Sequence, residues 1–204
     1  MRRKHAEITD RQTIENMLNR ATIGRMGTID RDGYPYITPV NFVYHQGAIY
    51  FHSAPEGEKL DNIARNPHVC FEVDIPLSYL DSAVDPEGRP CMMHQFFHCV
   101  IIRGEASVLP DGPMKTEALN ALSFKGEPDA HMQPVTADLP KYHMCKVVQI
   151  KPVSISMKSD LGQNRTAEGK LTIARHLAKR NRPGDDETVT TMGYDPEALR
   201  KDQA

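Results

Sequence analysis

The chain has 204 residues, with 25 lysines and arginines against 27 aspartates and glutamates, which gives a formal net charge of −2. This length predicts one domain, or one domain with an appendage, and is sufficient to bury a substantial core. The slightly negative charge argues against a protein that mainly binds nucleic acid. A membrane protein is not expected, because no apolar run approaches the roughly 20 residues that cross a bilayer. No apolar stretch follows the basic start of the chain, so a secretory signal is not expected either.

The four cysteines lie at positions 70, 91, 99 and 145 and contain no C-x-x-C pair. Two disulfides are possible by number. Cys70 and Cys99, however, lie within apolar runs, where free thiols behave as small hydrophobic groups. We therefore expect a reduced, cytoplasmic protein.

The first 74 residues predict two short helices and four closely spaced strands. The pattern at 9–12 matches a capping box, so we expect a short helix to begin there. Strands are then predicted at 23–29, 34–44, 48–53 and 68–74. Between the last two, a helix at about 58–65 is expected to end before Asn66-Pro67, because the residue before a proline disfavours helix. Pro35 and Pro39 restrict the second strand to a sheet edge or a bulge.

The rest of the chain predicts longer strands and more irregular structure. We expect a loop at 75–93, a strand at 94–109 with a bulge at Gly104, a helix at 114–124, one strand broken by Pro152 or two strands at 142–157, and a helix at 170–180. Beyond residue 158 the composition changes. We therefore predict a domain at 1–158 and a helical or irregular appendage at 159–204, which either wraps a partner subunit or frays. Closely spaced antiparallel strands with few helices favour a small barrel over a parallel α/β sheet.

One segment, YFHSAPEGEKLDNIARNPHVCFEVD at 50–74, predicts a site for a phosphorylated aromatic ligand. A strand ends in His52-Ser53, a short polar loop follows, and a helix begins with Lys59 in its first turn. The start of a helix offers N–H donors and a favourable dipole to a phosphate, and the lysine adds positive charge. The hydroxyl of Ser53 can donate as well. The alternative is that Lys59 is an ordinary solvated lysine.

This segment belongs to a longer resemblance. The stretch at 25–74, followed by FFHCVIIRGEASVL at 96–109, resembles the flavin-binding split-barrel superfamily, which includes pyridoxamine 5′-phosphate oxidase. The nitroimidazole-reductase-like (Nim) proteins are the most similar branch, and the likeness covers about 1–158. The resemblance implies a mainly β fold with peripheral helices, an antiparallel split β-barrel that forms a homodimer. It also implies that FMN binds in two equivalent clefts at the subunit interface.

The resemblance implies the following site residues. The phosphate is expected at Lys59 and Ser53. The flavin ring is expected against Thr38, Pro39, Val40, Asn41, Phe51 and His52, with Cys99 and Lys158 contributed by the second subunit. His52 is the candidate catalytic residue, because an imidazole can donate a hydrogen bond or a proton to a bound nitro or carbonyl oxygen. Alternatives remain open: Phe51 can be a core residue, His52 can simply bond to its loop, and Lys158 can be a surface lysine.

Several positions depart from the family pattern. Glu58 stands where an arginine often precedes the lysine, and Thr38 stands where the oxidases carry a phosphate-binding arginine. His98 and Cys99 replace an arginine and a glutamine, so substrate preference does not carry over. The oxidases also have a substrate-binding arginine and histidine near the C-terminus, and Arg175-His176, adjacent on a predicted helix, do not match that arrangement.

The sequence therefore predicts an FMN-dependent oxidoreductase that passes electrons from a reduced nicotinamide to a small planar acceptor such as a nitro-aromatic. The alternatives are a flavin- or haem-binding protein without turnover (a carrier, sensor or store, with His94 and His98 as candidate haem ligands) and a split barrel that binds a deazaflavin. A metal site at Cys91, His94, His98 and Cys99 is not expected, because residues i and i+4 on a strand lie about 13 Å apart. The expected partners are a second copy of the chain and a small-molecule substrate, with neither nucleic acid nor membrane.

Overall fold

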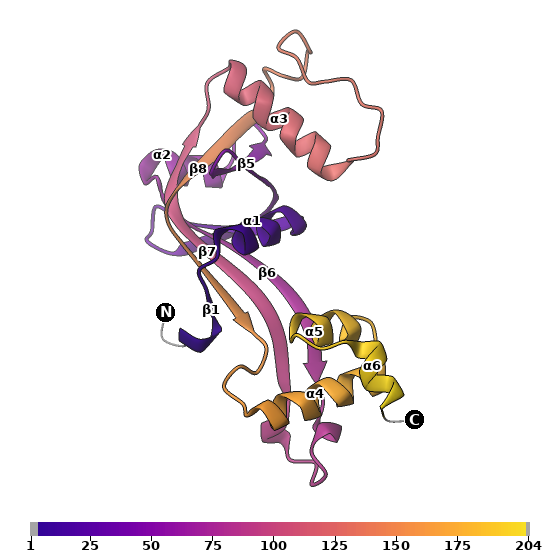
Figure 1. Cartoon of the computed structure of the whole chain (residues 1–204). Coiled ribbons are helices and arrows are strands. Elements are labelled where there is room, and N and C mark those ends of the chain that lie inside the picture. The colour runs from indigo at the N-terminus through magenta and orange to yellow at the C-terminus, as the bar shows by residue number, and fades with distance from the viewer. Residues whose placement is uncertain (1–3, 203–204) are drawn as a thin grey trace. The chain divides into compact units, whose positions relative to one another are not determined.

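The computed structural model of the protein describes residues 4–202, which form six α-helices and a mainly antiparallel sheet of eight strands (Figure 1). The strands are β1 (Glu7–Ile8), β2 (Ile23–Ile29), β3 (Pro35–Asn41), β4 (Val43–His45), β5 (Ala48–Ser53), β6 (His68–Leu80), β7 (His94–Val108) and β8 (Lys146–Asp160). The helices are α1 (Arg11–Arg20), α2 (Glu58–Arg65), α3 (Pro113–Gly126), α4 (Ala167–Arg180), α5 (Asp185–Thr191) and α6 (Pro196–Lys201). The strand order is β3-β2-β6-β7-β8-β5-β4, and β1 pairs with β8 outside this path. The prediction of a mainly β fold with additional helices is confirmed.

The chain divides into two compact units, which are described separately below. The sheet unit comprises residues 9–73 and 100–156. The helical unit comprises, within the described residues, 4–8, 74–99 and 157–202. The long strands β6, β7 and β8 each contribute residues to both units. Contacts therefore group 74–99 with the C-terminal helices, and a domain boundary at residue 158 stays a prediction.

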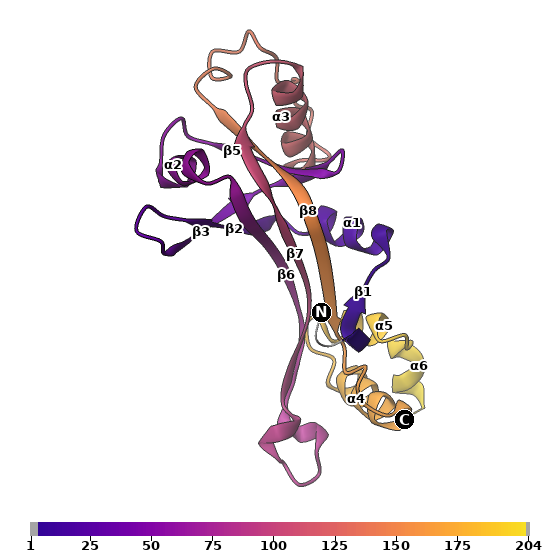
Figure 2. The ribbon, with the colours of Figure 1, turned by 90° about the vertical axis from the view of Figure 1, so that its left-hand side faces the viewer.

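In the sheet unit, β2 pairs with β3 and β6, while β5 pairs with β4 and β8, all antiparallel. β3 lies at one end of the strand order, which is the edge position that its two prolines predict. β3 also contacts β5, so the sheet curls into a half-barrel. Figure 2 shows the β2–β3 hairpin with α2 beside it, and α2 contacts β2.

Two predicted strands differ in detail from the observed ones. The strand expected at 34–44 is divided at Phe42, whose buried ring lies edge-on to Phe71 with the ring centroids 5.0 Å apart. β8, in contrast, is one continuous strand through Pro152. The pairing of β8 with β5 covers only 146–150 and that with β1 only 157–158. That side of β8 thus has no ladder partner at Pro152 among the described residues, and a missing N–H is tolerated there.

Two further differences concern single residues. α1 begins one residue later than the capping-box pattern predicts, because the carboxylate of Asp10 accepts the backbone N–H of Thr13 at 2.8 Å. Gly104, predicted to mark a bulge, lies where a Cβ atom would come within 2.4 Å of the carbonyl oxygen of Lys151. The glycine therefore allows β7 and β8 to approach closely.

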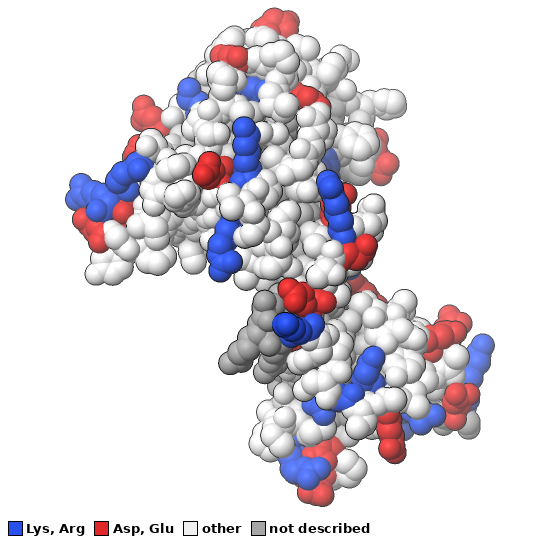
Figure 3. Space-filling view, turned by 60° about the vertical axis from the view of Figure 1, so that its left-hand side comes forward, with Lys and Arg blue, Asp and Glu red and all other residues white. Residues whose placement is uncertain are grey.

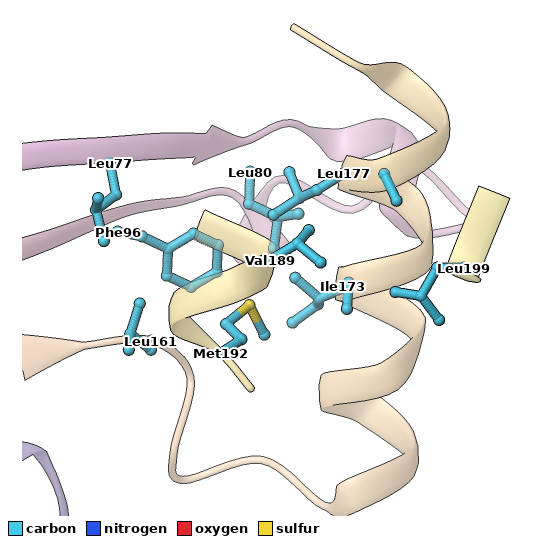
Figure 4. Close-up of a cluster of buried hydrophobic side chains, with 11 residues drawn as sticks. Leu77, Leu80, Phe96, Leu161, Ile173, Leu177, Val189, Met192 and Leu199 are labelled. Carbon is cyan, nitrogen blue, oxygen red and sulfur yellow. The ribbon is translucent and has the colours of Figure 1, made fainter. Parts of the chain in front are cut away.

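In the helical unit, three helices share one apolar core with the end of β6 and the start of β7 (Figure 1, Figure 4). Figure 4 shows Leu177 and Ile173 of α4 and Val189 of α5 facing Leu80 and Phe96. The predicted loop at 75–93 is thus wrong at its start, since β6 continues to Leu80 in order to bury apolar side chains under α4 and α5. The helices α5 and α6 were not predicted.

A network of ion pairs ties α4 and α5 to β6 within this unit. Arg180 donates to Asp185 at 2.6 and 2.9 Å and to Asp81 at 2.8 Å, and His176 bonds to the other oxygen of Asp81 at 2.8 Å. Asp185 is 1% exposed and also accepts the hydroxyl of Ser78 at 2.6 Å. Burial raises the pKa of Asp185, but the hydrogen bonds, led by that from Arg180, outweigh burial and lower this pKa overall. Residues 167–201 are therefore folded onto β6 as three helices.

The surface is charged, and the cysteines are not cross-linked. No helix within residues 4–202 is long and apolar enough to span a membrane. Lysines and arginines are interspersed with aspartates and glutamates on the face shown in Figure 3. None of the four cysteines, all within the described residues, forms a disulfide. A cytoplasmic location stays a prediction.

Candidate functional site

The start of α2 is fixed by a short segment that links it to β5. Gly57 precedes the helix with a φ of 141°, a value that glycine adopts readily, and no side chain caps the helix among the described residues. The amide of Asn62 donates to the hydroxyl of Thr28 at 3.0 Å, which holds α2 against β2. Lys59, in the first turn, is half-buried, whereas Glu58 is exposed. The N–H groups of Leu60 and Asp61 bond to the carbonyl oxygen of Gly57 at 2.8 and 3.3 Å. The first two N–H groups of the helix, those of Glu58 and Lys59, have no partner within the helix and lie beside a cation.

Two buried hydroxyls lie on the neighbouring strands. The Oγ1 atom of Thr38 on β3 and the Oγ atom of Ser53 on β5 are buried and have no hydrogen-bond partner within residues 4–202. The two strands contact each other. A hydroxyl buried without a partner costs about 1–3 kcal/mol by protein mutational data. A ligand with acceptor oxygens would remove that cost.

The four residues Thr38 to Asn41 end the edge strand β3. Pro39 and Asn41 are exposed, while Thr38 and Val40 are half-buried. One side of β3 pairs with β2, where the partners of these four residues are Met26, Arg25, Gly24 and Ile23. The opposite side of β3 is the edge of the sheet. Because β3 is an edge strand, its outer main-chain groups are available to a ligand.

Residues 51 and 52 point in opposite directions, as alternation along a strand requires. Phe51 is fully buried, so its ring is a core side chain and only its main chain can reach a ligand. His52 is exposed and lies with Asn41 in a cavity of about 280 Å³. The cavity is lined by Thr22, Asn41, Phe42, His52, Leu119, Leu122, Ser123, Lys125 and Gly126.

Lys125, at the end of α3, is a residue of this cavity that the sequence did not indicate. Its Nζ atom donates to the carbonyl oxygen of Leu18 at 2.9 Å and lies 3.9 Å from the centroid of the Phe42 ring. Burial lowers the pKa of Lys125 to about 8. The residue falls directly after the helix predicted at 114–124, and nothing local to residues 125–140 indicates a role. Only its contacts with Leu18 of α1 and with the ring of Phe42 identify it.

Cys99 and Lys158 belong to the helical unit, not to the sheet unit that holds the other candidate site residues. The Nζ atom of Lys158 donates to Asp160 at 2.7 Å and lies 4.6 Å from the ring centroid of Phe97. Burial raises the pKa of Asp160, but the hydrogen bond from Lys158 and the contact with His94 lower it overall. Cys99 is a half-buried thiol on β7 that forms no disulfide. No group of three or more His, Cys, Asp or Glu residues in the described part of the chain could hold a metal ion.

Comparison with known proteins gives the family. A model of the pyridoxamine 5′-phosphate oxidase family matches residues 10–159, so the chain belongs to that family. The resemblance inferred from the sequence is confirmed. A search of the curated proteins returned no match.

Solved structures similar to this chain include one protein above 25% identity and two below it. One is a protein from Bacteroides thetaiotaomicron provisionally described as a 5-nitroimidazole antibiotic resistance protein. It is 26% identical, has a TM-score of 0.62, and the match covers 74% of this chain and 85% of that one. The flavocytochrome Anf3 from Azotobacter vinelandii is 19% identical, with a TM-score of 0.66 and coverage of 83% and 76%. An FAD- and haem-binding protein from Mycobacterium smegmatis is 16% identical, with a TM-score of 0.66 and coverage of 81% and 78%. The last two share the fold alone.

Proposed function

We propose that the protein is an FMN-dependent oxidoreductase that transfers electrons from a reduced nicotinamide to a small planar acceptor such as a nitro-aromatic. The observation that carries the proposal is the pair of buried, unpartnered hydroxyls on Thr38 and Ser53. They lie on contacting strands, and the strand of Ser53 leads to an uncapped helix start with a half-buried lysine. Hydroxyls, N–H groups and a cation are the donor set that a phosphate dianion requires. The relative described for 5-nitroimidazole resistance supports the choice of acceptor.

Different residues would bind the phosphate and the ring of FMN. Lys59, Ser53, Thr38 and the first amides of α2 would hold the phosphate, and the main chain of β3 together with Asn41 would hold the ring. The flavin supplies the redox chemistry, while the chain supplies position and electrostatics. His52, exposed to the cavity, would donate a hydrogen bond or a proton to an oxygen of the acceptor. Cys99 and Lys158 are proposed to approach the flavin of the other subunit.

We further propose that the protein is a homodimer with flavin at the interface. An exposed apolar side chain at a surface hollow supports this part of the proposal. Val153 is 75% exposed and lines a hollow of about 530 Å³ together with Ile29 and Val69, with His68, Arg103 and Glu105 also at its wall. Exposed apolar surface rimmed by polar residues is typical of an interaction site. The substitution Val153→Asp should turn a dimer into a monomer in light scattering, and a wild-type protein that is monomeric at all concentrations would contradict this part.

The absorption spectrum of the purified protein tests the cofactor. Paired bands in the blue and near-ultraviolet indicate an oxidised flavin, whereas a Soret band indicates haem and would overturn the proposal. Release of the flavin by denaturation and chromatography separates FMN from FAD and from a deazaflavin. Anaerobic bleaching by NADH or NADPH, with recovery of colour when nitrobenzene is added, then tests turnover. A flavin that no nicotinamide bleaches would indicate a carrier, sensor or store.

A further inference from the structure

The cavity beside His52 has the size and lining for one aromatic ring. Its volume is about 280 Å³, and its walls include the ring of Phe42 and the side chains of Leu119 and Leu122. An apolar cavity of about 150 Å³ lined by Leu, Ile and Phe is large enough to bind benzene. One substituted ring therefore fits, and the imidazole of His52 is available to its substituents.

Lys125 is the only basic residue other than histidine among the described residues that line this cavity, and its charge is not neutralised there. None of the described residues places a carboxylate within ion-pair distance of its Nζ atom. Its polar contacts are one hydrogen bond to a carbonyl oxygen and the face of an aromatic ring. An ammonium group has three donors, so two remain available. Burial of an uncompensated cation is unfavourable, as the lowered pKa of Lys125 reflects. An anion in the cavity would reverse this penalty.

We propose that this cavity is the acceptor subsite of the enzyme and that Lys125 selects acceptors carrying an anionic substituent, such as an aromatic carboxylate. The inference rests on the proposed function for the identity of the reaction, but the binding of an anionic ring can be measured without turnover. The apolar walls hold the ring and the ammonium group pairs with the carboxylate. His52 is left to the group that is reduced.

The titratable groups around Lys125 allow a pH test. His52 lies in the same cavity, and the hydrogen-bonded pair His45–Glu117 lies with Lys125 along a second hollow on the other side of α3. The pKa of Lys125 is lowered to about 8, so its charge is present below this pH and lost above it. The affinity for an anionic ring should therefore fall as the pH rises through about 8. The substitution Lys125→Arg keeps a charge at every accessible pH and should remove this fall.

The experiment compares 4-nitrobenzoate with 4-nitrobenzyl alcohol, which has a similar shape without the charge. Dissociation constants are measured by titration of the oxidised holoprotein, for wild type, Lys125→Met and Lys125→Arg, at pH 7 and pH 9.5. Wild type should prefer the anion by about tenfold or more at pH 7, as expected for one charge-assisted contact. This preference should disappear in Lys125→Met and persist in Lys125→Arg at both pH values. Melting temperatures of the variants show that each is folded.

The outcomes separate the two proposals. Equal preference in wild type and Lys125→Met, or no binding of either ring, would overturn the role of Lys125. If the preference depends on Lys125 but neither compound is reduced by the bleached flavin, the subsite stands and the proposed reaction fails. Reduction of both compounds without any charge preference would leave the reaction in place and refute the subsite.

Discussion

The two unpartnered hydroxyls lead to a prediction whose sign depends on the cofactor. In Ser53→Ala, the flavin-free protein should be as stable as wild type or more stable, whereas FMN binding should weaken. The Oγ atom of Ser53 is buried, the residue is 6% exposed, and no described residue accepts or donates a hydrogen bond to this atom. The substitution therefore removes a polar group without removing an interaction within the protein.

The size of each effect differs between the flavin-free and the flavin-bound protein. Without flavin, loss of a buried unpaired hydroxyl removes a penalty of about 1–3 kcal/mol, less the cost of the small void that an oxygen leaves. In a protein of this length each kcal/mol raises the melting temperature by about 2–4 °C. With flavin, loss of a hydrogen bond to a charged phosphate oxygen costs about 1.5–3 kcal/mol, which raises the dissociation constant about 10- to 150-fold. Thr38→Val should behave in the same way.

The assay measures melting temperatures of flavin-free protein and FMN dissociation constants by fluorescence quenching. Thr28→Val is the matched control, because the hydroxyl of Thr28 is also buried but accepts from Asn62 at 3.0 Å and donates to the carbonyl oxygen of Tyr36 at 3.4 Å. That control should be destabilised by about 1–3 kcal/mol. The reasoning is refuted if flavin-free Ser53→Ala melts at a clearly lower temperature, or if its FMN affinity equals that of wild type.

Three other predictions concern α2 and the helical unit. Lys59→Ala should weaken FMN binding by about 1.5–3 kcal/mol while Lys59→Arg restores most of it, and unchanged affinity in equilibrium titration would place the phosphate elsewhere. Leu177→Ala, at a fully buried position, should lower the free energy of unfolding in urea by about 2–5 kcal/mol, against less than about 0.5 kcal/mol for the exposed control Lys179→Ala. Asp185→Asn should cost about 3–5 kcal/mol at neutral pH, because it leaves Arg180 without its buried partner. The pKa of Asp185 is lowered from 3.8, so its stabilisation is complete above this pH and is lost as the pH falls further. The difference between Asp185→Asn and wild type should therefore shrink in acid, and a difference independent of pH would contradict this assignment.

The sequence predicted those elements whose pattern is local. β2 and β5 have the predicted bounds, and α2 matches the prediction of about 58–65, because turn residues and Pro67 mark their ends. α5 could not be predicted in this way. It has seven residues, too few to be stable alone, and forms because Val189 is buried and Asp185 pairs with Arg180. The end of β6 was missed for the same reason, since Leu77 and Leu80 are buried by helices about 90 residues further along the chain.

The site residues, too, were predictable where they are close in sequence and unpredictable where they are far apart. Ser53 and Lys59 are linked by one continuous motif, so the sequence indicates them together. Lys125 acquires its environment from Leu18 and Phe42, which are 107 and 83 residues away. No spacing in the sequence indicates such a contact. The burial of Phe51 and the direction of His52 were likewise left open by the sequence, because they depend on which face of β5 is covered.

The charges around the start of α2 decide how the phosphate is held. Lys59 is accompanied in this turn by Glu58 and Asp61, so the side chains alone carry a net negative charge. Both carboxylates are exposed, and their repulsion is reduced by solvent and salt. The half-buried ammonium group and the uncapped N–H groups are screened less, and the hydrogen bonds that Thr38 and Ser53 would donate to the phosphate should be nearly independent of salt. The proposed site therefore relies on dipoles and hydroxyls to a larger extent than one with an additional arginine. For this reason we expect Ser53→Ala and Thr38→Val together to weaken FMN binding at least as much as Lys59→Ala, and to do so by the same factor at low and at high ionic strength.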